Sequence, residues 1–70
     1  MTLKKRSLNL AGHATSVALE PEFWTELERL AVEQGHSLAG LVGAIDQARG
    51  QRPLASACRL AALEAARRGR

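Results

Sequence analysis

Side chains that could contact phosphate occur at two points in the sequence. The first is a basic run near the N-terminus, formed by Lys4, Lys5 and Arg6. The second is Ser37, which follows Gly35 where a helix is expected to begin and whose side chain could cap that helix. The free N–H groups of the first helical turn, at Ser37, Leu38 and Ala39, could then meet an oxyanion. The alternative is an ordinary N-cap that holds no ligand.

The remaining candidate side chains predict neither catalysis nor a metal site. Cys58 is the only cysteine, which excludes a disulfide within the chain. His13 and His36 have no further histidine or cysteine at metal-ligand spacing. No nucleophile stands beside a base with an orienting partner, and no glycine-rich phosphate loop follows a strand. We therefore expect a protein that is not an enzyme and that binds no metal or cofactor.

The net charge of +3 is distributed unevenly along the chain. Residues 1–19 carry a net charge of +3 and no acid, and residues 20–46 carry −5. Residues 47–70 carry six arginines and one glutamate, a net charge of +5. Basic ends around an acidic middle favour contact with phosphate through both ends of the chain. The alternative is that these terminal charges are simply solvated.

A segment with a two-residue period is expected to position the first of these groups. Residues 14–20 predict a strand whose buried face carries Thr15, Val17 and Leu19. His13, which precedes the strand, falls by alternation at the edge of the same face. The outward face carries Ala14, Ser16 and Ala18. Residues 6–10 also alternate, and Gly12 permits a bend between the two segments. Pairing of residues 6–10 with 14–19 in a hairpin within one chain is therefore an open alternative.

Helical periodicity begins at Pro21, whose fixed φ suits the first position of a helix. Gly35 is expected to end this helix. The three predicted helices cover about residues 21–34, 38–49 and 54–68. The first has an apolar stripe of Phe23, Leu27, Leu30 and Ala31, with Trp24 on its flank. The second has Leu38, Leu41, Val42 and Ile45, and the third has Ala57, Cys58, Leu60 and Leu63.

The chain of 70 residues is long enough for one small domain with a modest core. We expect a flexible basic arm at residues 1–6, a core at residues 7–50 and a C-terminal helix at residues 51–70. Without a disulfide or a structural metal, oligomerisation is the remaining way to stabilise so small a core. The longest uncharged apolar run, residues 37–45, is too short to span a bilayer, and no signal-peptide core follows the N-terminus. These features predict a cytoplasmic protein.

Two motifs in this sequence resemble a branch of small bacterial ribbon-helix-helix proteins. The first, Gly-His-x-Thr-Ser, is present as Gly12-His13-Ala14-Thr15-Ser16. The second, Glu-x-x-Phe-Trp, is present as Glu20-Pro21-Glu22-Phe23-Trp24. Residues 54–64 are similar to the C-terminal helix of that branch. The resemblance covers nearly the whole chain and implies a mainly α, β-α-α dimer with an intersubunit antiparallel β-ribbon and an additional C-terminal helix.

The resemblance also implies a homodimeric DNA-binding protein, either a transcriptional regulator or an antitoxin-like protein. In the wider family the ribbon enters the major groove, and the start of the second helix contacts phosphate. The residues that this arrangement would place at DNA are Lys4, Lys5, Arg6, Ala14, Ser16, Ala18, Ser37 and Leu38. A higher homo-oligomer and a protein partner are compatible with the pattern, and a membrane is not.

The predicted outward face of the strand departs from the usual pattern of a base reader. Ala14 and Ala18 can touch only a thymine methyl group, and Ser16 alone can donate or accept a hydrogen bond. Three alternatives remain open: little sequence is read through the ribbon, the basic arm and the Asn9 region read it, or DNA is not bound. The alternative function is a dimeric protein-interaction module that retains the fold.

Overall fold

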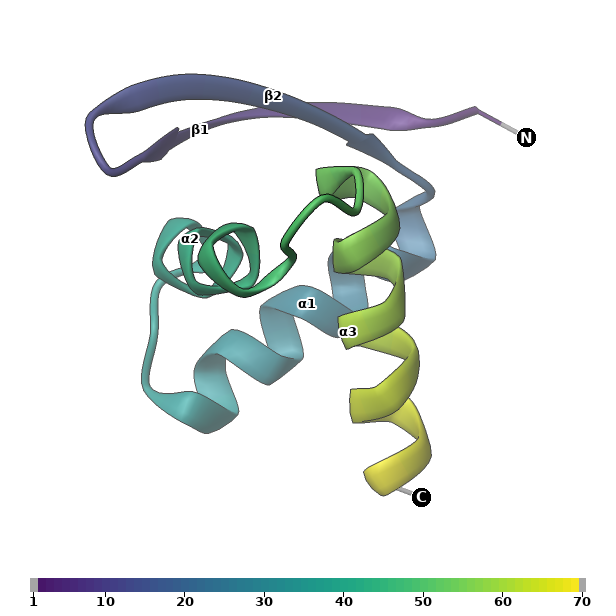
Figure 1. Ribbon diagram of the computed structural model, residues 1–70. Coiled ribbons are helices and arrows are strands. Elements are labelled where there is room, and N and C mark those ends of the chain that lie inside the picture. The colour runs from purple at the N-terminus through teal and green to yellow at the C-terminus, as the bar shows by residue number, and fades with distance from the viewer. Residues whose placement is uncertain (1, 70) are drawn as a thin grey trace.

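A computed structural model describes residues 2–69, which form a β-hairpin followed by three helices (Figure 1). The elements are β1 (Lys4–Leu10), β2 (His13–Leu19), α1 (Pro21–Gln34), α2 (Leu38–Ala48) and α3 (Leu54–Arg68). The hairpin lies across one side of the helices, with β1 against α2 and β2 against α3. The predicted strand followed by two helices and an additional C-terminal helix are confirmed, whereas the ribbon predicted between two subunits is a hairpin within one chain. Met1 and Arg70, predicted to belong to the arm and the last helix, lie outside the described residues.

The two strands pair with each other in an antiparallel register within one chain. Of the alternatives for residues 6–10, the hairpin is therefore the arrangement that forms, and β2 does not depend on another chain for its first strand partner. The basic run also differs from the sequence prediction. Lys4, Lys5 and Arg6 are part of β1 and face Leu19, Ala18 and Val17 across the ladder, so they are not a flexible arm.

The hairpin turn requires two consecutive residues with positive φ. Ala11 has a φ of 53° and Gly12 a φ of 86°, as in the two-residue turns whose twist matches that of the strands. Glycine accepts this conformation easily, whereas alanine does so at some cost. The side chain of Asn9 stabilises the turn, because its Oδ1 accepts a hydrogen bond of 3.0 Å from the Gly12 amide.

Trp24 is the residue of α1 that joins the helices to the hairpin. It is only 2% exposed, and its Nε1 donates a hydrogen bond of 2.7 Å to the backbone oxygen of Lys4. Phe23 is only partly buried, so the two neighbouring aromatics exchange the roles that the sequence predicts for them. The remaining predicted stripe of Leu27, Leu30 and Ala31 is buried. The indole N–H suits Trp24 to the buried position, because it satisfies the Lys4 carbonyl, which a phenylalanine ring cannot do.

The boundaries of α1 and α2 follow the predicted capping residues. Pro21 opens α1, and Gly35 ends it in the left-handed conformation with a φ of 73°. Ser37 caps α2, since its Oγ accepts a hydrogen bond of 3.0 Å from the Gly40 amide. Leu41 and Val42 are the buried residues of α2, while Leu38 and Ile45 pack against the edge of the core.

The sequence prediction for the apolar face of α3 is partly wrong. The buried residues of this helix are small: Ala57, Cys58, Ala62 and Ala65. The two leucines assigned to the same stripe, Leu60 and Leu63, are 45% and 48% exposed. Small side chains allow α3 to approach α1 closely. The leucines therefore lie on a different side of the helix. Burial raises the pKa of the Cys58 thiol, so it stays protonated at neutral pH.

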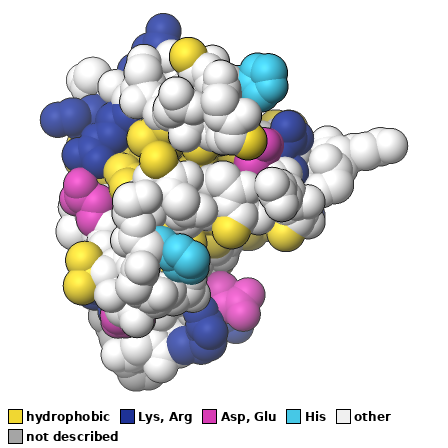
Figure 2. Space-filling view, turned by 90° about the vertical axis from the view of Figure 1, so that its left-hand side faces the viewer, with side chains coloured by type: hydrophobic (Ala, Val, Ile, Leu, Met, Phe, Trp, Pro, Cys, Tyr) yellow, Lys and Arg dark blue, Asp and Glu magenta, His cyan; other side chains and the backbone are white. Residues whose placement is uncertain are grey.

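Neither a membrane-spanning helix nor a metal-binding cluster occurs in residues 2–69. None of the helices described there has the length and apolar composition needed to cross a membrane. Within the same residues, no group of three or more His, Cys, Asp or Glu side chains could hold a metal ion. The two histidines illustrate this, because they lie well apart on the side of the molecule shown in Figure 2.

Candidate nucleic-acid interface

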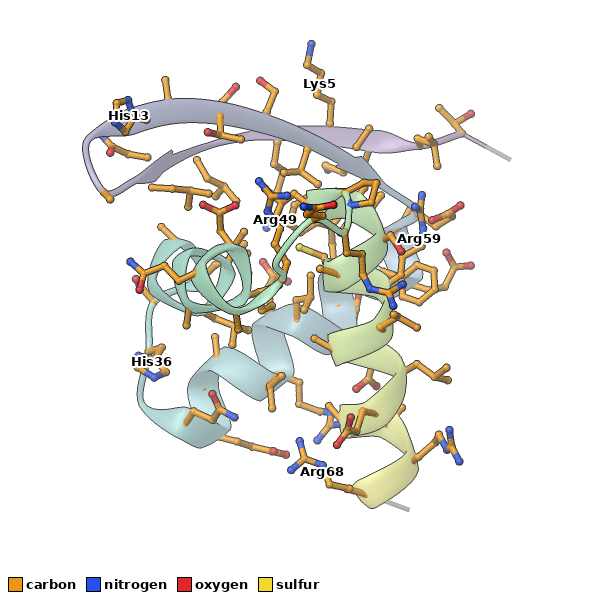
Figure 3. The ribbon with its side chains drawn as sticks, viewed as in Figure 1. Lys5, His13, His36, Arg49, Arg59 and Arg68 are labelled. Atoms are coloured by element: carbon orange, nitrogen blue, oxygen red, sulfur yellow. The ribbon has the colours of Figure 1, made fainter. Side chains whose placement is uncertain are left out.

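The outer face of the hairpin consists of six side chains from three cross-strand pairs. The register places Lys5 opposite Ala18, Ser7 opposite Ser16, and Asn9 opposite Ala14. These side chains point away from the helices, because the alternate positions of both strands are turned toward the core. Figure 3 shows Lys5 projecting outward from the hairpin. The predicted outward face of β2 is thus present, and β1 adds three residues to it.

Lys5 is the only long basic side chain on this outer face. Ser7 and Ser16 form a hydrogen bond with each other, with 3.2 Å between their Oγ atoms. The Oδ1 of Asn9 is engaged by the Gly12 amide, which leaves the two N–H donors of its side chain for other partners. The face therefore offers one exposed lysine ammonium, one oriented amide and a pair of hydroxyl groups to a ligand that lies against it.

Arg6 has a different environment from its neighbour Lys5. It lies on the inner side of β1, where its guanidinium donates to Glu28 Oε2 at 3.0 Å. The same guanidinium is 5.1 Å from the centroid of the Trp24 ring. Of the three basic residues predicted to contact phosphate, Arg6 is thus held by α1. Lys4 stands at the exposed beginning of β1.

The start of α2 lies beside the turn of the hairpin. A hollow of about 500 Å³ is bordered by Asn9 and Ala11 on the hairpin and by Ser37 and Gly40 on α2. Ser37 caps the helix with its own side chain, and Leu38, the next residue, is partly buried. The structure therefore places the start of α2 beside the turn of the hairpin, whereas Lys4, Lys5 and Arg6 lie at the other end of β1.

A second hollow follows β2. Its volume is about 540 Å³, and it is bordered by Thr15, Ser16 and Val17 of β2 and by the connection between α2 and α3. Arg49 fixes that connection, because it donates to Asp46 at 2.6 Å and to the backbone oxygen of Arg52 at 2.7 Å. β2 contains no lysine, arginine, aspartate or glutamate, whereas β1 carries three cations.

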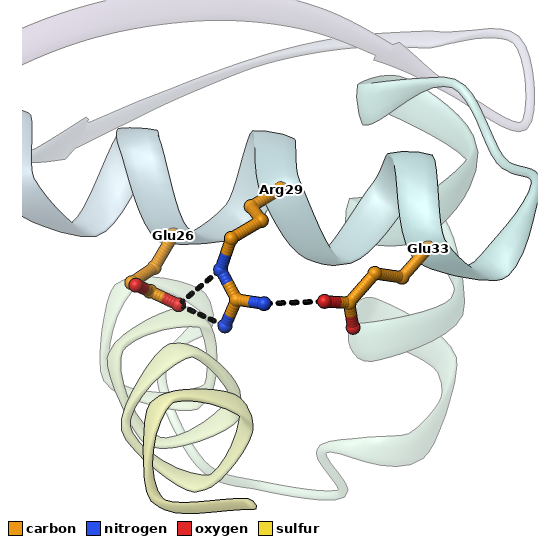
Figure 4. A network of polar contacts seen from close by, with 3 residues as sticks. All are labelled: Glu26, Arg29 and Glu33. Atoms are coloured by element: carbon orange, nitrogen blue, oxygen red, sulfur yellow. Dashed lines mark hydrogen bonds and ion pairs between the residues drawn. The ribbon is translucent and has the colours of Figure 1, made fainter. Parts of the chain in front are cut away.

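Several other arginines form ion pairs with acidic side chains of the same chain. On α1, Arg29 bridges Glu26 and Glu33 (Figure 4), and Glu26 accepts at 2.7 Å. These contacts, the hydrogen bond with Glu26 first, raise the pKa of Arg29. On α3, Arg59 donates to Glu20 Oε1 at 2.9 Å and lies 5.8 Å from the centroid of a phenylalanine ring.

The Arg59–Glu20 contact predicts a pH-dependent contribution to stability. The hydrogen bond from Arg59 lowers the pKa of Glu20 below its usual value of 4.5. A carboxylate with a lowered folded-state pKa stabilises the fold above the unfolded pKa and loses that effect as pH falls through the folded pKa. We expect Glu20→Gln to be less stable than the parent at pH 7 and to approach it at about pH 2.5. Urea unfolding at both values tests this, and an equal deficit at both would contradict it.

Comparison with known families identifies the architecture. The family model of the ribbon-helix-helix domain matches residues 3–66, nearly the whole chain. The chain belongs to the ribbon-helix-helix family. No curated protein and no solved structure matches it. Ribbon-helix-helix domains generally form dimers and bind DNA as regulators rather than act as enzymes.

Among the residues of the outer face, Ser7 is not assigned to DNA by the sequence, and Asn9 enters there only within one of the open alternatives. Both became part of the outer face only because β1 pairs with β2 in register. A signal was present in the alternation of polar Lys5, Ser7 and Asn9 with Leu8 and Leu10. That alternation predicts a strand with one apolar face, but it does not reveal which partner the strand takes.

Proposed function

We propose that this ribbon-helix-helix chain is a cytoplasmic DNA-binding regulator, or the antitoxin-like member of an autoregulated pair. The observation that carries the proposal is the outer face of the hairpin, where Lys5 projects among small serine, asparagine and alanine side chains. On such a surface the lysine can reach a phosphate or a guanine edge without obstruction from its small neighbours. Ser37 and Leu38, at the N-terminus of α2, supply a backbone phosphate contact beside the hairpin turn.

We propose further that two chains pair through the free edges of β2. A two-stranded hairpin leaves one edge of each strand unpaired, and strand edges that carry lysine resist further pairing. The edge of β1 carries Lys4 and Lys5, whereas the edge of β2 has no lysine or arginine and borders an open hollow. Pairing of β2 with β2 would give a four-stranded sheet with two copies of the outer face, and with Ser16 near its centre.

This dimer predicts a particle mass of twice the 7.5 kDa of one chain. Sedimentation equilibrium at micromolar concentration is expected to give about 15 kDa, because the mass of a twofold assembly is the sum of its two chains. A folded species of 7.5 kDa under these conditions would contradict the dimer. It would leave DNA binding by a single hairpin face as a separate question.

The decisive experiment on function adds an arginine to the outer face. Ala14→Arg places a long cation on the same side as Lys5, so we expect DNA affinity to rise by roughly tenfold at low salt. Ser16→Ala is expected to change affinity much less, since a single hydroxyl discriminates less than a bidentate contact worth about 1–3 kcal/mol. Fluorescence anisotropy with one set of mixed duplexes measures both.

A matched control separates contact from net charge. Val32→Arg adds the same charge on α1, where Val32 is 79% exposed and lies outside the hairpin. If Ala14→Arg and Val32→Arg raise affinity equally, the outer face does not meet DNA. The alternative, a protein-interaction module, then becomes the better function. It is favoured by Ala14 and Ala18, which offer no hydrogen bonds, and by the mutual engagement of Ser7 and Ser16.

A further inference from the structure

The third helix carries an apolar face that the chain does not cover. Leu60 and Leu63 stand one turn apart and are 45% and 48% exposed, although two other sides of α3 pack against α1 and α2. The fully buried side chains of α3 are small, and these two adjacent leucines stay exposed although the hydrophobic effect favours their burial. The uncovered pair therefore points to a partner rather than to the core of this chain.

The charges around these leucines are predominantly basic. A shallow hollow of about 640 Å³ is bordered by Leu60, Leu63, Glu64, Arg67 and Arg68. Arg67 and Arg68 form no ion pair within residues 2–69, in contrast to Arg6, Arg29, Arg49 and Arg59. We refer to Leu60, Leu63, Arg67 and Arg68 as the α3 stripe.

The charge of α3 decides whether a second copy of this chain or a different protein fits the α3 stripe better. From Leu54 to Arg68, α3 contains three arginines and one glutamate. A second copy packed helix to helix would bring two surfaces of net positive charge together, with only Glu64 of each to offset them. A helix with acidic residues on either side of an apolar stripe complements both the leucines and the unpaired arginines.

We propose that the α3 stripe binds an acidic amphipathic helix of a partner protein. The leucines of the stripe contact the apolar side of that helix, and Arg67 and Arg68 pair with its carboxylates. This site lies on α3 and does not involve the outer face of the hairpin, so it is independent of the DNA-binding proposal. It adds a second binding surface that recognises protein.

The test uses the full chain and two synthetic peptides, without DNA. The acidic peptide has 18 residues, leucines at positions i, i+3, i+4 and i+7, and glutamates on the flanking positions. The second peptide has lysine in place of every glutamate. We expect the parent to bind the acidic peptide saturably in fluorescence anisotropy and to bind the basic peptide at least about tenfold more weakly.

Variants assign the binding to the α3 stripe. Leu60→Ser with Leu63→Ser should weaken binding of the acidic peptide by about tenfold or more, because two leucines no longer bury apolar surface against it. Arg67→Gln with Arg68→Gln should weaken it mainly at low salt. Both pairs are exposed, so circular dichroism is expected to show an unchanged fold. Val32→Ser, at another exposed apolar residue, is the matched control and should bind as the parent does.

Three results would overturn the proposal. One is equal binding of the two peptides, which would show that charge plays no part. Another is unchanged binding by the leucine double variant, which would place the site elsewhere. The third is a fall in the sedimentation mass of the unliganded protein on replacing the leucines, which would show that a second copy covers the stripe.

Discussion

Replacement of Trp24 by alanine is expected to lower the free energy of unfolding by about 3–5 kcal/mol, the usual cost of deleting a buried tryptophan. The side chain is 2% exposed and fills the space between α1 and the hairpin. Its loss also leaves the Lys4 carbonyl without the hydrogen bond that it receives at 2.7 Å. Small domains are commonly stable by only about 5–15 kcal/mol, so a large fraction of the variant should unfold well below the parent's melting temperature.

Two controls separate the contributions of Trp24. Trp24→Phe keeps an aromatic ring but removes the N–H donor, and it should cost about 1–2 kcal/mol. Phe23→Ala removes a neighbouring aromatic that is only partly buried, so its effect should be smaller than that of Trp24→Ala. Urea denaturation followed by circular dichroism compares all three. A Phe23→Ala deficit equal to that of Trp24→Ala would refute the assignment of Trp24 as the residue that joins hairpin and helices.

Lys5 and Arg6 are adjacent cations for which we expect opposite consequences. Lys5→Ala should leave the melting temperature unchanged and reduce DNA affinity by roughly tenfold at low salt. The slope of log affinity against log salt should fall by about one for each phosphate that is no longer neutralised. Arg6→Ala should instead lower stability by about 1 kcal/mol, because it removes a half-exposed ion pair and the cation–π interaction with Trp24.

Measurement of both quantities for both variants tests this division of roles. The DNA titration is made at a temperature where each variant is fully folded, so that stability does not enter the apparent affinity. If Lys5→Ala binds DNA as tightly as the parent does, the outer face of the hairpin has no role in phosphate contact. If Arg6→Ala weakens DNA binding while stability is unchanged, Arg6 leaves Glu28 to contact DNA.

Most of the local structure was predictable from the sequence, because it depends on residues that are close together. The period of two in β2 correctly separated Ala14, Ser16 and Ala18 from Val17 and Leu19. Pro21, Gly35 and Ser37 correctly marked helix ends, since capping is a property of a few neighbouring residues.

The features that the sequence did not reveal depend on distant partners. The pairing of β1 with β2 is only one alternative at the level of sequence, because the alternation of a strand does not identify its neighbour. The engagement of Arg6 depends on Glu28, 22 residues away. The exposure of Leu60 and Leu63 follows from the close approach of α3 to α1 through alanines, which a helical period alone does not determine.

The reactivity of the Cys58 thiol reports the separation of α3 from the rest of the protein. The thiol is completely buried, and burial raises its pKa, so an alkylating reagent can react only when α3 separates from the rest of the molecule. The rate of labelling therefore measures how often that separation occurs, without any added probe. A ligand that binds only the closed form slows the labelling in proportion to its occupancy, whichever surface it uses. One cysteine thus provides a common scale on which DNA and a protein partner can be compared.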